Sequence, residues 1–116
     1  MTLEPGSLRT RLCDLLECEY PVILAGMGGV ARAALAAAVA NAGGFPTLGM
    51  VREAPSLINS EMEAYRRLSD RPFAVNLIPA ATDPGLLDQQ IETCLAMEAG
   101  VFSFFWDVMP EAVLPR

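Results

Sequence analysis

Short runs of apolar residues alternate along the chain with longer stretches in which apolar residues recur at helical spacing. The apolar runs begin near residues 22, 45, 73 and 101, in steps of 23, 28 and 28 residues. Runs without polar alternation are typical of strands buried on both faces of a parallel sheet. The pattern therefore predicts a repeating strand–helix unit and an α/β fold with parallel strands.

The elements expected from this pattern follow one another at short intervals. We expect strands over Tyr20–Ala25, Phe45–Met50, Phe73–Ile78 and Val101–Trp106, and helices over residues 8–17, Val30–Ala42, Pro55–Leu68 and Pro84–Gly100, with a further helix over Met109–Arg116. Gly43 and Gly44 suit a left-handed helix end, and Asp83 suits a helix N-cap.

The inner faces of three helices are predicted from apolar residues at helical spacing. These are Leu8, Leu12, Leu15 and Leu16 in the first helix, Leu57, Ile58, Met62, Tyr65 and Leu68 in the third, and Leu86, Leu87, Ile91, Leu95 and Met97 in the fourth.

Two architectures use such strand–helix units. An eight-fold (β/α)₈ barrel needs about 250 residues, and an open doubly wound sheet carries helices on both faces. The even spacing and short loops of these 116 residues favour the N-terminal half of a barrel. Residues 1–116 are thus interpreted as a single partial domain of about four strand–helix units.

Ligands of either architecture bind at the carboxyl ends of the strands. Three glycines at Gly26–Gly29 let a backbone approach a flat or anionic ligand closely, although a tight strand-to-helix turn explains them equally well. Asn76 is a polar residue in an apolar strand, and its amide requires a partner from a ligand or from a neighbouring loop. The adjacent charges Arg52 and Glu53 indicate a solvated turn, and Asp107 indicates a helix cap.

Composition removes several classes of function. The net charge of −6 and the absence of a basic stripe disfavour nucleic-acid binding. The chain has no histidine, which excludes catalytic triads and histidine bases within it, and no metal site is predicted. Three cysteines without a CxxC pattern fit reduced thiols and a cytoplasmic location. Ala33–Val51 is uncharged, but glycines and a proline interrupt it, so we expect a helix and a strand rather than a membrane span.

Four segments taken in order resemble the nitronate monooxygenase family, once called 2-nitropropane dioxygenases. They are YPVILAGMGG, AAAVANAGGFPTLGMV, DRPFAVNLIP and VFSFFWD, which cover most of Leu12–Pro110. The resemblance implies an FMN-binding TIM barrel that oxidises alkyl nitronates with O₂. It also implies that Ala25, Gly26 and Met27 lie against the isoalloxazine ring and that Asn76 contacts FMN. The family usually has proline in place of Gly26, and glycine there loosens the turn.

The same resemblance places the family's catalytic histidine and its phosphate-binding loops beyond the fourth strand. We therefore expect no catalytic residue within these 116 residues, weak FMN binding and no turnover by the chain alone. Alternatives left open are an FMN-dependent enoyl or quinone reductase and a non-catalytic truncated remnant. Unpaired strand edges at Tyr20–Ala25 and Val101–Trp106 would permit self-association.

Overall fold

The computed structural model describes residues 8–106, which form an α/β fold around a small parallel sheet. Its strands are β1 (Thr47–Gly49), β2 (Ala74–Leu77) and β3 (Val101–Phe104), in that order across the sheet. In both pairs the strands run parallel, and Leu48, Val75 and Phe102 lie side by side across the sheet. The predicted parallel α/β arrangement is confirmed, with each of these strands two or three residues shorter than expected.

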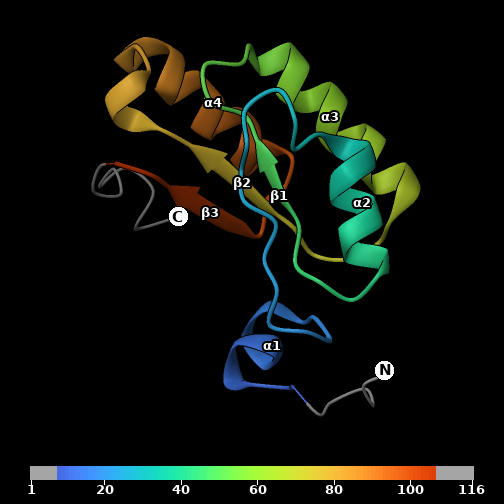
Figure 1. Ribbon diagram of the computed structural model, residues 1–116. Helices are drawn as coiled ribbons and strands as arrows, with labels where there is room; N and C mark the ends of the chain where they lie inside the picture. The colour runs from blue at the N-terminus through green and yellow to red at the C-terminus, as the bar shows by residue number, and fades with distance from the viewer. Residues whose placement is uncertain (1–7, 107–116) are drawn as a thin grey trace.

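Two helices precede the first strand, and the others lie in the connections between the strands (Figure 1). They are α1 (Arg11–Leu16), α2 (Ala33–Asn41), α3 (Pro55–Leu68) and α4 (Pro84–Ala96), with a short 3₁₀ helix, η1 (Pro79–Ala81), before α4. Helix α2 packs against α3, and α3 packs against α4. In the described part of the chain no helix is both long and apolar enough to cross a membrane, and Ala33–Val51 consists of α2 followed by β1.

The core lies between the sheet and this row of helices. Ile58, Met62 and Tyr65 of α3 have no exposed surface, and they pack in one cluster with Leu48 and Val75 of the strands. The prediction for α3 is confirmed at these three positions, whereas Leu68 is 55% exposed because it lies in the last turn, beyond the sheet.

Helix α2 begins at Ala33, later than the predicted Val30. The residues before it form a turn in which Ala31 N–H donates to the Met27 carbonyl and Gly29 has a φ of 75°. Its first free amide, that of Ala33, donates to the Glu61 carboxylate of α3 at 2.9 Å. This long-range cap satisfies a helix end that has no side-chain cap of its own, and no local sequence pattern reveals it. Gly43, with a φ of 102°, ends the helix in the left-handed conformation as predicted.

The prediction of a first strand buried on both faces is wrong. Within Tyr20–Ala25 only Ile23 forms a bridge, to Phe45, and Val22 and Ile23 are 59% and 51% exposed. A ladder needs backbone partners, and among the described residues a neighbour pairs with this segment on one side alone.

The inner face predicted for α1 is also wrong. Leu8, Leu12 and Leu15 are exposed, and Cys13 is the buried side chain of this helix, with Leu16 partly buried beside it. The helix has only six residues, so a contact of one turn with the amino end of the sheet decides which side is covered. The predicted cap at Asp107 and helix at Met109–Arg116 lie outside the described residues.

The predicted N-cap of α4 is confirmed, because the Asp83 carboxylate accepts from the amides of Gly85 and Leu86. Replacing Asp83 with alanine leaves these amides without that partner. We expect the Asp83→Ala variant to lose about 1 kcal/mol of unfolding free energy in urea titrations. The control Asp88→Ala, at an exposed position in the same helix, should change it by less than about 0.5 kcal/mol; equal losses for both would contradict the capping role.

Candidate functional site

A cavity of about 380 Å³ opens at the carboxyl ends of the strands. It is lined by Ala25, Gly26, Met27, Asn76, Ile78, Ser103, Phe105 and Trp106. All four residues predicted to bind the cofactor, Ala25, Gly26, Met27 and Asn76, are therefore in one place, although 49 positions separate Met27 from Asn76 (76 − 27). Parallel strands bring this about, because their carboxyl ends share one edge of the sheet.

Asn76 is one of two polar residues in the strand wall of this cavity, the other being Ser103, and it is 7% exposed. Its Nδ2 donates to both the carbonyl oxygen and the hydroxyl of Ser103, each at 3.1 Å. Ser103 is its partner in register on β3, so the amide bonds to a neighbouring strand rather than to a loop. These two bonds turn the donor side of the amide toward β3 and leave Oδ1 on the side of Gly26.

The glycine loop lies directly on the strand ends. A Cβ atom built at Gly26 would lie 2.3 Å from Asn76 Cβ, and one at Gly49 would lie 2.5 Å from the Met27 carbonyl oxygen. Both distances are far below van der Waals contact, so a Cβ atom at either position would force the loop and the strand ends to move apart. The absence of a side chain at Gly26 thus has a local reason, which is the Asn76 side chain beneath it.

The other walls of the cavity are apolar and accessible. Met27, Phe105 and Trp106 are 43%, 53% and 72% exposed, and the rings of Phe105 and Trp106 lie 4.9 Å apart. The residues that line the cavity, all within the described part of the chain, carry no charge. A neutral planar group matches these walls, whereas a phosphate would find no cation among them.

The charged side chains of the β1–α3 connection bond to other parts of the chain. Arg52, in the left-handed region with a φ of 58°, donates from Nε to the Ala81 carbonyl at 2.6 Å. Glu53 pairs with Arg32 at 2.7 Å. The expectation of a merely solvated turn is wrong for Glu53, because the pair joins this connection to the start of α2. Neither side chain lines the cavity.

Gln90 is a structural residue that sequence reasoning missed. It is fully buried on α4, and its Nε2 donates to the carbonyls of Met50 and Glu53 at 3.1 and 2.9 Å. Among the described residues its Oε1 has no hydrogen-bond partner. The residue holds the connection that follows β1 against α4. Its place one position before Ile91 and four before Cys94 is the only signal of an inward-facing side chain.

The contact of the glycine loop with β1 predicts a strong effect at Gly49. We expect Gly49→Val to lose about 3 kcal/mol of unfolding free energy, because its side chain would displace the Met27 carbonyl. Gly100→Val is the control, since a Cβ atom there meets nothing within 4 Å. Urea unfolding followed by circular dichroism measures both, and a smaller loss for Gly49→Val than for the control would contradict the close packing.

Comparisons with known proteins agree with this geometry. A family model described as nitronate monooxygenase matches residues 9–105. The chain is 38% identical over 78 residues to a (3aS,4S,5R,7aS)-5-hydroxy-7a-methyl-1-oxo-octahydro-1H-indene-4-carboxyl-CoA dehydrogenase of Mycobacterium tuberculosis, covering 67% of this chain and 22% of that protein. It is 41% identical over 70 residues to a probable nitronate monooxygenase of Staphylococcus saprophyticus, covering 60% of this chain and 20% of that protein.

A solved structure supports the barrel interpretation. FabK from Thermotoga maritima superposes with a TM-score of 0.77 at 34% identity, over 84% of this chain and 30% of FabK. The prediction that these strand–helix units are a portion of a TIM barrel is confirmed. The chain spans about a fifth of the length of the curated relatives that it matches.

Proposed function

Because the chain belongs to the nitronate monooxygenase family, we propose that its cavity holds the isoalloxazine ring of FMN in an enzyme that oxidises alkyl nitronates with O₂. One observation carries the proposal: Ala25, Gly26, Met27 and Asn76, which the family resemblance selects, line a single cavity. The volume of about 380 Å³ lies within the range of about 300–1,000 Å³ usual for small-molecule sites.

The residues present fit the ring of this cofactor better than its phosphate. The ring is flat and largely apolar, as are the walls at Met27, Phe105 and Trp106, and its polar edge can meet an amide. The uncharged lining offers nothing to a phosphate, so a phosphate site belongs to other parts of the whole enzyme. FMN, when bound, would supply the electron acceptor for oxidation of the substrate and would react with O₂.

The roles of individual residues follow from their positions. Oδ1 of Asn76 would accept a hydrogen bond from an N–H of the ring, because Nδ2 is already bonded to Ser103. Met27 and Trp106 would shield the ring from water, and Gly26 would hold the loop backbone against Asn76 beside the ring. The chain contains no histidine, so a histidine that moves the substrate proton would come from the rest of the enzyme.

The exposed first segment supports a larger assembled barrel. Val22 and Ile23 are about half exposed, and Ile23 pairs on one side with Phe45. Further strands beside this segment would cover it, either from a longer protein or from a second copy. Sedimentation of the purified chain distinguishes the two routes, because only the second makes the chain self-associate.

A reductase is the second candidate. The Mycobacterium tuberculosis relative named as a dehydrogenase matches this chain about as well as the relative named as a probable nitronate monooxygenase. An FMN-dependent enoyl or quinone reductase would place the same ring in the same cavity.

The only tryptophan of the chain, Trp106, lines the cavity and reports on flavin binding. Titrating the full chain with FMN and with riboflavin should quench the Trp106 fluorescence to the same extent. The two affinities should be similarly weak, because the contacts are to the ring. Met27→Ala removes one wall and should weaken both affinities about tenfold, since a large apolar contact contributes about 1.4 kcal/mol or more.

Val30→Ala is the matched control, because Val30 is 58% exposed and does not line the cavity. Its affinities should equal those of the unaltered chain. Quenching that FMN produces and riboflavin does not would assign recognition to the phosphate and overturn the ring site. Equal weakening by both variants would do the same.

A further inference from the structure

Two cysteines meet at the end of α1, near the amino ends of the strands and thus at the opposite end of the sheet from the cavity. Glu17 ends the helix with a φ of 56°, and the N–H of Cys18 donates to the Cys13 carbonyl at 3.1 Å. A bond between residues five apart across a left-handed residue is the Schellman arrangement, which brings the side chains at its two ends into contact. At this turn those two side chains are thiols.

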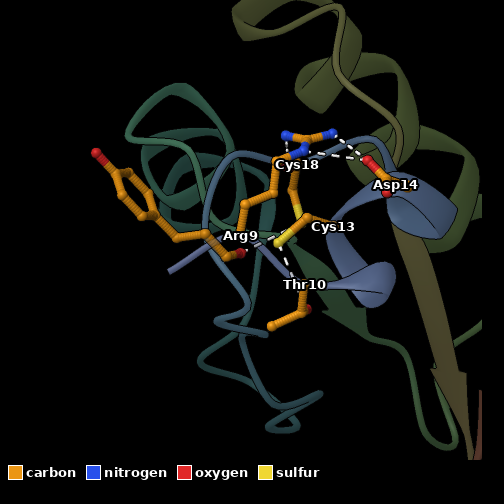
Figure 2. Close-up of polar contacts among 6 residues, drawn as sticks. Arg9, Thr10, Cys13, Asp14 and Cys18 are labelled. Carbon is orange, nitrogen blue, oxygen red and sulfur yellow. Dashed lines mark hydrogen bonds and ion pairs between the residues drawn. The ribbon is translucent and has the colours of Figure 1, made fainter. Parts of the chain in front are cut away.

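Both thiols are shielded from solvent and lie against each other. Cys13 and Cys18 are 0% and 6% exposed, and they pack together with Phe45 and Ala74 below the amino ends of the strands. Figure 2 shows Cys13 and Cys18 with the neighbouring Arg9, Thr10 and Asp14. The proximity of the two thiols lowers the pKa of Cys13 and raises that of Cys18. The third cysteine, Cys94, lies in the other core cluster.

The surroundings make the two thiols unequal. Sγ of Cys13 lies 3.8 Å from the Thr10 hydroxyl, and Sγ of Cys18 donates to the Tyr20 carbonyl at 3.3 Å. A hydrogen bond from the Thr10 backbone lowers the pKa of Cys13 despite the opposing effect of burial. Burial raises the pKa of Cys18. A thiol with a lowered pKa forms the attacking thiolate more readily, which favours Cys13 as the nucleophile.

We propose that Cys13 and Cys18 are a redox-active dithiol that closes to an intrachain disulfide by exchange with a small-molecule disulfide. The Cys13 thiolate attacks one sulfur of the reagent RSSR, which forms a Cys13–S–SR mixed disulfide and releases RS⁻. Cys18 then gives up its proton and attacks Sγ of Cys13, which forms the Cys13–Cys18 bond and releases the second RS⁻. Two protein thiols are oxidised, and one RSSR is reduced to two thiols.

The reagent can reach the thiols only when α1 opens. The structure indicates that this opening costs little free energy. The helix has six residues, too few to be stable without its packing. Its burial rests mainly on Cys13, Cys18 and Leu16, because Leu12 and Leu15 are exposed. Local opening of such a segment costs less free energy than global unfolding. Closure of the disulfide would then fix the turn at Cys18, which precedes the segment Tyr20–Ala25 and the glycine loop of the cavity.

The full chain itself provides the test, under native conditions with oxidised glutathione. We expect the number of free thiols to fall from three to one. Trypsin cleaves after Arg11 and Arg32, so both cysteines lie in peptide 12–32 and Cys94 lies in another peptide. Peptide 12–32 should therefore lose two hydrogens in mass and carry no glutathione. Retention of three free thiols, or a disulfide that involves Cys94, would overturn the proposal.

Two variants separate the roles of the thiols, and the result for the unaltered chain does not depend on their folding. Cys18→Ser should stop at a stable glutathione adduct on Cys13, because the resolving thiol is gone. Cys13→Ser should keep Cys18 free over the same period. Adduct formation on Cys18 and not on Cys13 would contradict the assignment of the nucleophile. The same reaction in urea is the control, where pairing with Cys94 should also occur.

Discussion

Replacing Tyr65 with alanine is expected to lower the free energy of unfolding by about 3–5 kcal/mol, as for other large aromatic residues in cores. Tyr65 has no exposed surface and lies on the buried face of α3, near the C-terminal end of the helix. Its ring centroid is 4.7 Å from that of Phe73, and its hydroxyl donates to the Arg71 carbonyl at 2.9 Å. Alanine would remove the ring from the contact between α3 and Phe73, the residue before β2. Urea unfolding monitored by circular dichroism measures the loss.

The variant Tyr65→Phe separates packing from hydrogen bonding. It keeps the ring and removes the hydroxyl, so we expect a loss of about 1 kcal/mol. A loss in Tyr65→Ala no larger than in Tyr65→Phe would show that the ring does not support the core, contrary to the structure.

Alkaline pH is expected to destabilise the protein through Cys94. Burial alone raises the pKa of this thiol from its ordinary value of 9.0 to about 12, and its side chain has no exposed surface. Below pH 9 the thiol is protonated in both states and has no effect. As the pH rises from 9 to 12, the unfolded chain releases this proton and the folded chain keeps it, so stability falls. The shift of about three units in the pKa of Cys94 corresponds to a loss of about 4 kcal/mol of unfolding free energy.

Comparison with Cys94→Ala isolates this contribution, because the other groups titrate alike in both proteins. Burial also raises the pKa of Tyr65, which adds a loss of the same sign that is common to both. The unfolding free energy of the unaltered chain should therefore fall more steeply between pH 9 and 12 than that of Cys94→Ala. Parallel curves would show that the folded thiol ionises as readily as the unfolded one.

The fold could be predicted where side-chain pattern and local rules agree. Pro55 begins α3, Asp83 caps α4 and Gly43 ends α2, since each position needs a backbone or side-chain property that one residue type supplies. Prediction failed where the neighbour is distant in sequence. Val22 and Ile23 look like a buried strand, but their burial depends on a strand on their far side, and α1 is covered at Cys13 by residues near positions 45 and 74.

The candidate site divides in the same way. Gly26 and Asn76 were recognised as residues of the site from the resemblance, and a polar residue in an apolar strand marks Asn76 without it. That Asn76 bonds to Ser103, and that Gly26 lies directly on Asn76, could not be predicted, because strand register sets both contacts. Gln90 was missed because a glutamine in a helix usually faces solvent, and only the backbone carbonyls of Met50 and Glu53 make its burial favourable.

The sequence by itself determined the order of strands and helices and the parallel sheet, because apolar periodicity and turn residues act over a few neighbouring positions. It also indicated the family, through the resemblance of four segments taken in order. The tertiary structure decided which side chains meet: Asn76 with Ser103, Glu61 with the start of α2, and Cys13 with Cys18. Those contacts depend on register and on the direction of each helix face. They are set when the whole core packs, and no short segment contains the information.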